Sequence, residues 1–162
     1  MNQRQRLLLA MATACLAAVG AALVLQYRFD MQPCPWCVLQ RLIYLAIAAV
    51  AFITLAWRGR IGCLAGGSAM LLLAACGAAA ALWQHFLAAA SASCNLTLAE
   101  RIISALGLDE RLPEVFTAYA SCADAKVNLL GVPFEFWSLI LFAALGWMAL
   151  RVLQIDHRRP GF

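Results

Sequence analysis

Charged side chains are scarce in this sequence. They make up 12% of its 162 residues, whereas hydrophobic residues make up 65% and the mean hydropathy is +0.83. Soluble domains average about 25% charged and about 45–50% apolar residues. The composition therefore excludes a soluble globular protein and predicts a single membrane domain over residues 1–162.

The sequence also lacks clustered basic residues, internal repeats, low-complexity linkers and a phosphate-binding glycine loop. A nucleic-acid-binding surface needs grouped Lys and Arg side chains. We therefore expect no nucleic acid among the partners, and we expect the lipid bilayer to be the main environment.

Four apolar segments are long enough to cross a bilayer, because a transmembrane helix needs about 20 predominantly apolar residues. The predicted fold is an all-α integral membrane protein, a four-helix transmembrane bundle. The expected spans are about 7–25, 38–57, 61–83 and 133–150. Two of the connecting loops, about 26–37 and 84–132, carry the polar residues and cysteines discussed below.

Arginines are concentrated at the two chain ends and in the loop between the second and third spans. They are Arg4, Arg6, Arg58, Arg60, Arg151, Arg158 and Arg159. Positive residues near span ends favour the cytoplasmic side. We therefore expect both termini in the cytoplasm and the other two loops on the outer side.

The long outer loop contains one helical pattern. Thr97 and Glu100 have the spacing of a capping box, and Gly107 fits a C-terminal cap. The apolar stripe between them is Leu98, Ile102 and Leu106. This pattern predicts a short amphipathic helix, which either packs on the bundle or rests on the membrane surface.

Seven cysteines fall into two groups. Those within or at the end of spans, where a cysteine behaves as a small hydrophobe, are Cys15, Cys63 and Cys76. Those in the outer loops are Cys34, Cys37, Cys94 and Cys122. An even set in an oxidising compartment indicates disulfides. Four cysteines allow three connectivities, of which the short spacing favours Cys34–Cys37 and leaves Cys94–Cys122.

The C-x-x-C pair Cys34 and Cys37 is a weak structural staple, because a disulfide that encloses so little chain restrains little. Haem attachment would need a histidine where Val38 stands. A zinc site would need four converging ligands, which the loops could supply only without disulfides. Thiol–disulfide exchange explains the pair better, whereas a purely structural role stays open for Cys94–Cys122.

Arg41 follows Cys37 by four residues and is the only charge entering the second apolar segment. Residues i and i+4 share one helix face, and a charge within a span is a functional-site hypothesis by default. The alternative is that Arg41 snorkels to the interface. His85, at the outer end of the third span, either borders the same pocket or is an interfacial histidine.

The sequence resembles the DsbB family, the disulfide-bond-formation membrane proteins of bacteria. The resemblance rests on four spans, C-x-x-C after the first, Arg41 beyond its second cysteine, and a cysteine pair in the long loop. Smaller matches are Leu112-Pro113-Glu114-Val115-Phe116 ahead of Cys122, Leu130-Gly131, and Trp137 entering the last span.

This resemblance implies a quinone-dependent protein-thiol oxidoreductase of the bacterial inner membrane. It would reoxidise a periplasmic DsbA-type thiol oxidase and pass the electrons to ubiquinone or menaquinone; DsbA, DsbB and quinone together keep the periplasm oxidising. Cys94–Cys122 would accept electrons from the partner through a mixed disulfide with Cys94. Cys34–Cys37 would be reduced next, and Cys37 would pass electrons to quinone beside Arg41, with His85 as a further candidate.

Two other functions remain as alternatives. Vitamin K epoxide reductases also combine C-x-x-C with loop cysteines, but their C-x-x-C comes after the loop pair, whereas here it comes first. A soft-metal carrier could use thiols at the membrane edge. The positive charge of Arg41 would repel such a cation.

Overall fold

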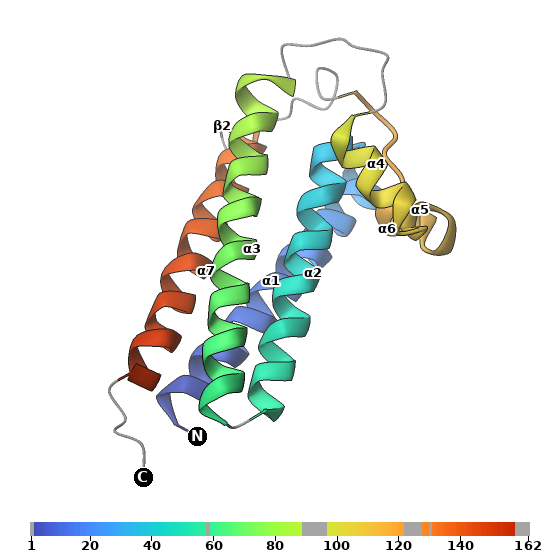
Figure 1. Ribbon diagram of the computed structural model, residues 1–162. Helices are drawn as coiled ribbons and strands as arrows, with labels where there is room; N and C mark the ends of the chain where they lie inside the picture. Colours follow the sequence, from blue (N-terminus) through green and yellow to red (C-terminus); the bar gives the residue numbers. More distant parts are fainter. Residues whose placement is uncertain (1, 58, 89–96, 122–127, 130, 158–162) are drawn as a thin grey trace.

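Four long helices run side by side in the computed structural model (Figure 1), which describes residues 2–57, 59–88, 97–121, 128–129 and 131–157. They are α1 (Gln3–Phe29), α2 (Pro35–Ala56), α3 (Arg60–Phe86) and α7 (Phe134–His157). Each contains a stretch long and apolar enough to cross a membrane. The predicted all-α four-helix bundle is confirmed.

The helices extend beyond the expected spans because a helix does not have to end where its apolar run ends. Gln26 lies inside α1, which continues to Phe29 and ends at Asp30 in the left-handed conformation, with φ 52°. Pro35 occupies the first position of α2, where its missing N–H and fixed φ suit a helix start. Cys37 therefore lies in the first turn of α2, within the helix and not in the loop before it.

The N-terminus of α1 and the C-terminal end of α7 lie at the same end of the bundle (Figure 1). The α1–α2 connection and the short helices of the long loop lie at the opposite end. This arrangement agrees with the prediction that both termini share one side. Which side of the membrane that is remains a prediction.

Glycines allow α3 to approach its neighbours closely. A Cβ on Gly77 would overlap the ring of Phe142 in α7, and a Cβ on Gly67 would lie 2.6 Å from Leu153 of the same helix. Gly66 likewise faces Thr54 of α2. Small residues at such positions are typical of helix interfaces in membranes.

The long loop contains three short helices and a two-residue ladder. They are α4 (Leu98–Ala105), α5 (Leu108–Arg111), α6 (Pro113–Phe116), β1 (Asn128–Leu129) and β2 (Val132–Pro133). The two strands pair antiparallel. The capping box of α4 is present as predicted, since Thr97 Oγ1 accepts from Glu100 N and Glu100 Oε2 accepts from Thr97 N at 2.7 Å.

The buried face of α4 differs from the stripe read in the sequence. Ala99 and Ile103 are buried, whereas Leu98 and Leu106 are 62% and 54% exposed. Ile103 packs with Val38 of α2 and Phe116 of α6 in a small apolar cluster. The helix is therefore packed on the bundle through Ala99 and Ile103. Contact of the exposed leucines with the membrane surface remains a prediction.

Candidate functional site

Cys34 and Cys37 lie at the start of α2. Cys34 is the N-cap residue, and its Sγ accepts a hydrogen bond from the backbone N–H of Cys37 at 3.4 Å. The two sulfur atoms are 3.1 Å apart, longer than the roughly 2.05 Å of a disulfide bond. The two sulfur atoms are in direct contact, so only a small side-chain rotation separates them from disulfide geometry, while formation of the bond itself requires an acceptor for two electrons and two protons.

The two sulfurs have different surroundings. Cys34 is fully buried, whereas Cys37 is partly exposed and lines a cavity of about 250 Å³. Of this pair, Cys37 is therefore the cysteine that a molecule in the cavity could reach.

Small side chains on α1 leave the space for this cavity. Ala18, Ala21 and Ala22 have the spacing of one helix face, and all three line it. The opposite wall comes from α7, and the end near the α1–α2 connection is polar. The residues that complete the lining are Leu25, Met31, Gln32, Pro33, Gln40, Arg41, Tyr44, Gln84, Phe134, Trp137, Ser138 and Leu141.

Arg41 lies one turn below Cys37 and is 5% exposed. Its Nη1 donates to Gln26 Oε1 at 2.7 Å and to the backbone oxygen of Val115 at 3.1 Å. The guanidinium is thus held inside the protein by α1 and α6 and does not extend to water. A buried cation with oxygen acceptors at this position is suited to stabilise negative charge in the cavity.

Two buried glutamines complete the polar end of the cavity. Gln84 Nε2, from the last turn of α3, donates to Cys37 Sγ at 3.3 Å. Gln40 Nε2 donates to Gln84 Oε1 at 2.8 Å. The two amides thus connect α3 directly to the Cys37 sulfur.

Tyr44 of α2 also lines the cavity, one turn of helix beyond Arg41. Its ring stacks on Phe142 with centroids 4.3 Å apart and planes 4° from parallel. Its hydroxyl donates to the backbone oxygen of Ser138 at 3.3 Å. These contacts fix the position of Tyr44 against α7.

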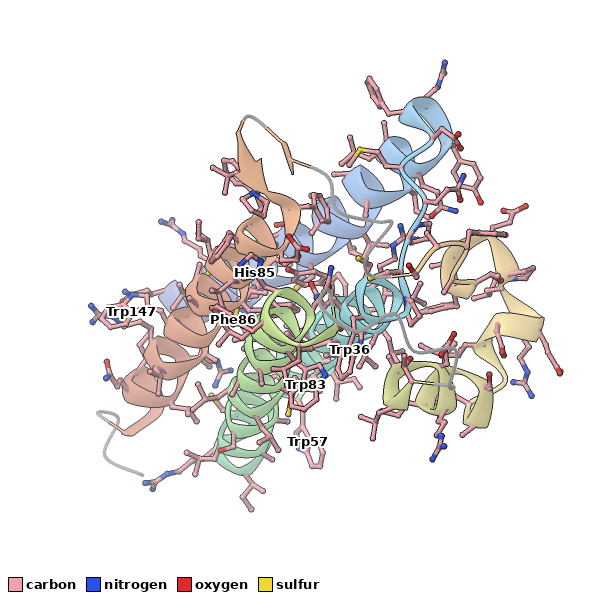
Figure 2. All side chains as sticks on the ribbon, turned by 90° about the horizontal axis from the view of Figure 1, so that it is seen from above. Trp36, Trp57, Trp83, His85, Phe86 and Trp147 are labelled. Carbon is pink, nitrogen blue, oxygen red and sulfur yellow. The ribbon has the colours of Figure 1, made fainter. Side chains whose placement is uncertain are left out.

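His85 is not among the residues that line the cavity. Its ring packs on Phe136 of α7 and on Phe86, with centroids 4.7 Å and 4.9 Å apart. Figure 2 shows His85 on the α7 side of α3. Trp83 lies on the side of α3 that faces α2, and its ring centroid is 6.2 Å from that of Trp36 in α2. The preceding residue, Gln84, takes the place in the cavity wall that the sequence suggested for His85.

Cys94 and Cys122 lie outside the described residues. The described segment that leads to Cys122 is nevertheless attached beside the C-x-x-C pair. Tyr119 and Ala120 donate their backbone N–H groups to the oxygen of Pro33, at 3.0 Å and 3.4 Å. The loop therefore returns to the residue just before Cys34.

The remaining cysteines lie away from this site, as expected. Cys15 and Cys63 are fully buried in the bundle, and Cys76 is exposed on α3. None of them lines the cavity.

Comparisons with known proteins agree with the geometry. The family described as disulfide bond formation protein DsbB matches residues 4–152. The chain is 32% identical to disulfide bond formation protein B of Pseudomonas syringae pv. tomato over 162 residues, covering 99% of this chain and 95% of that protein. It is 33% identical to the protein of the same name from Chromobacterium violaceum over 165 residues, covering 99% and 97%.

The chain belongs to the DsbB family. The resemblance read from the ordered cysteines is thereby confirmed. The protein is an oxidoreductase of disulfide bond formation, a multi-pass membrane protein of transmembrane helices, and its function implies a thiol oxidase partner.

Sequence reasoning missed the glutamines and Tyr44. Gln26, Gln40 and Gln84 are all at most 5% exposed, although each stands at the polar end of an apolar run. A buried amide must find hydrogen-bond partners, so their common location at the loop end of three different helices was the available signal. It was weak because a glutamine at a span end can equally face the lipid headgroups.

Proposed function

We propose that the protein reoxidises a periplasmic DsbA-type thiol oxidase and passes the electrons to a membrane quinone, ubiquinone or menaquinone. One observation carries this proposal. The Cys37 sulfur and the Arg41 guanidinium line the same cavity, which is apolar on the side of α1 and polar at its outer end.

The residues of the cavity suit a quinone head group. Small-molecule sites are mostly apolar clefts of about 300–1,000 Å³ with a few placed polar groups. The cavity of about 250 Å³ has this character on a slightly smaller scale, with Ala21 and Leu141 among its apolar side chains and Arg41 among its donors. When bound, a quinone would accept two electrons and two protons.

Electrons would enter through the long loop. A thiolate of the reduced partner attacks the Cys94–Cys122 disulfide and forms a mixed disulfide with Cys94. The second partner thiol resolves it, which leaves the partner oxidised and Cys94 and Cys122 as thiols. A thiolate of this pair then attacks the Cys34–Cys37 disulfide, so the two electrons and two protons move to Cys34 and Cys37.

The hydrogen bonds of Tyr119 and Ala120 to Pro33 support exchange between the two cysteine pairs. They attach the segment before Cys122 to the residue before Cys34. Exchange between disulfides needs an attacking thiolate in direct reach of the target sulfur, and this attachment shortens the distance that the loop must span.

At the cavity, the chain's own groups would act on the Cys37 thiolate. Arg41 favours negative charge on the sulfur and on an oxygen in the cavity, because opposite charges at short range stabilise each other. Cys34 closes the disulfide with Cys37 as the electron pair leaves. His85 remains a proposed contributor, since its ring contacts Phe136, the neighbour of the cavity residue Trp137.

For the location, we propose the bacterial inner membrane with both termini cytoplasmic and the cysteine loops periplasmic. The arginines at the ends of α1 and α7 and between α2 and α3 support this orientation. A partner that is itself a secreted thiol oxidase could meet only the outer loops.

The test measures quinone reduction by purified protein with a reduced DsbA-type protein as electron donor. Cys37→Ser should reduce turnover to background, because no sulfur in the cavity can then form the disulfide. The matched control is Cys76→Ser, which removes an exposed thiol on α3 and should turn over at the wild-type rate. Turnover by Cys37→Ser at more than half of the wild-type rate would refute the proposal.

A further inference from the structure

The side-chain amide of Gln84 contacts the reactive sulfur directly. Its Nε2 donates to Cys37 Sγ at 3.3 Å, while its Oε1 accepts from Gln40 Nε2 at 2.8 Å. Gln84 is 3% exposed and Gln40 is 4% exposed. The three groups form a chain of hydrogen bonds from α2 through α3 and back to α2.

The donor and acceptor roles in these two hydrogen bonds matter for thiol chemistry. A thiolate has no proton and can only accept a hydrogen bond. An amide can present either its oxygen or its nitrogen, and the wrong choice would place an oxygen against the negative sulfur. Because Gln40 donates to the Gln84 oxygen, the Gln84 nitrogen is the atom that faces Cys37.

We propose that Gln84 is a catalytic residue that donates a hydrogen bond to the Cys37 thiolate, and that Gln40 is the positioning residue that holds the amide in this orientation. This inference rests on the proposed function, in which Cys37 reacts as a thiolate.

Gln84 and Arg41 therefore have different tasks. The hydrogen bonds of Arg41 Nη1 go to Gln26 and to Val115, so it influences Cys37 through its charge. Gln84 is neutral and touches the sulfur itself. A neutral donor stabilises the thiolate while adding no second cation to a buried cavity, where each uncompensated charge is costly.

The experiment follows alkylation of Cys37 in reduced, detergent-solubilised protein without quinone at pH 7, with iodoacetamide as the probe. Peptide mass spectrometry separates Cys37 from the other cysteines. Gln84→Leu should slow alkylation about tenfold, the size expected for one hydrogen bond to a charged group. Gln84→Glu should be at least as slow, because a carboxylate cannot donate and repels the thiolate.

Gln40→Leu should slow alkylation of Cys37 by only about threefold, because the Gln84 amide remains but can rotate so that its oxygen, and not its nitrogen, faces the sulfur. Gln154→Leu, which removes an exposed amide from α7, is the matched control and should react at the wild-type rate. If Gln84→Leu does not fold, Gln84→Asn replaces it. Its shorter side chain keeps the amide but does not reach the sulfur, so it should also react slowly.

A Gln84→Leu or Gln84→Asn rate within twofold of wild type overturns the role of Gln84, and an unchanged rate in Gln40→Leu overturns that of Gln40. Quinone turnover by Cys37→Ser is measured in parallel. Turnover in that variant refutes the proposed function, whereas its loss combined with normal alkylation in the Gln84 variants refutes only the present inference.

Discussion

The Nη1 atom of Arg41 lies 3.1 Å from the backbone oxygen of Val115 and donates a hydrogen bond to it. One residue belongs to the start of α2 and lines the cavity, and the other belongs to α6 in the long loop. The guanidinium thus joins the cavity to the loop segment that leads to Cys122.

Tyr27 makes a second attachment of the same segment. Its hydroxyl donates to the backbone oxygen of Glu114 at 2.9 Å. Together with the bonds of Tyr119 and Ala120 to Pro33, these contacts fix residues 114–120 across the ends of α1 and α2. We call residues 114–120 the strap.

Removing the Tyr27 hydroxyl should loosen the strap without changing the cavity. One neutral hydrogen bond contributes about 0.5–1.5 kcal/mol, so Tyr27→Phe should lower kcat with the reduced partner roughly two- to twelvefold. The quinone KM should stay the same, because Tyr27 does not line the cavity. Steady-state kinetics in both substrates measure the two constants.

Tyr119→Phe is the control for Tyr27→Phe, because it removes a hydroxyl from the strap but keeps the bond between Tyr27 and Glu114. It should leave kcat unchanged. A raised quinone KM in Tyr27→Phe with unchanged kcat would mean that the strap does not position the loop for exchange.

Substitution of Arg41 should affect quinone binding first. Lys keeps the charge but is a hydrated point charge without the planar fork of a guanidinium. Loss of one or two charge-assisted hydrogen bonds, each about 1.5–3 kcal/mol, should raise the quinone KM in Arg41→Lys roughly ten- to a hundredfold or more. Arg41→Gln should raise the quinone KM and also reduce the reactivity of Cys37, because the charge that favours the Cys37 thiolate is lost as well.

Arg60→Lys provides the control for Arg41→Lys, since Arg60 lies at the opposite end of α3 from the cavity. Its quinone KM should equal that of wild type. An Arg41→Lys variant with wild-type quinone KM would show that the guanidinium does not contact the quinone.

The sequence was sufficient for features that depend on neighbouring residues. The four spans follow from long apolar runs, and the α4 cap follows from Thr97 and Glu100. Each of these signals is local, so tertiary packing did not have to be known. The order of the cysteines added the family resemblance.

The contacts of the cavity could not be predicted in the same way. Gln26, Gln40 and Gln84 belong to three helices, and their meeting depends on how each helix is rotated about its axis. Similarly, α4 buries Ile103 because Val38 and Phe116, which receive it, belong to other elements. The stripe of Leu98, Ile102 and Leu106 did not identify this buried face, and its contact with the membrane surface stays a prediction.

A methyl group added at Gly77 should destabilise the bundle and displace Tyr44 in the cavity lining. Its Cβ would overlap the ring of Phe142, which stacks on the cavity residue Tyr44. Overpacking of this kind costs about 1–3 kcal/mol, so Gly77→Ala should lower the thermal unfolding midpoint and raise the quinone KM. Gly20→Ala is the matched control, because nothing lies within 4 Å of a Cβ at that position. Equal midpoints in the two variants would contradict the close approach of α3 to α7.

The attachment of the strap to Pro33 predicts which cysteines can pair between the two loops. Ala120 donates to Pro33 at 3.4 Å, and Cys34 follows Pro33 directly. Two residues of chain, from Ala120 to Cys122, span at most about 7 Å. A disulfide needs Cα atoms about 4.4–6.8 Å apart. Cys34 and Cys122 should therefore be able to form a bond without displacement of the strap.

Two double variants test this pairing. Cys37→Ser with Cys94→Ser leaves Cys34 and Cys122 as the loop cysteines, and most molecules should form the Cys34–Cys122 disulfide in air. Cys34→Ser with Cys94→Ser leaves Cys37 instead, whose sulfur is held by Gln84 at the cavity. That variant should form little Cys37–Cys122 disulfide in the same time. Non-reducing digestion and mass spectrometry identify the linked peptides, and faster formation of Cys37–Cys122 would mean that Cys37, and not Cys34, receives electrons from the loop.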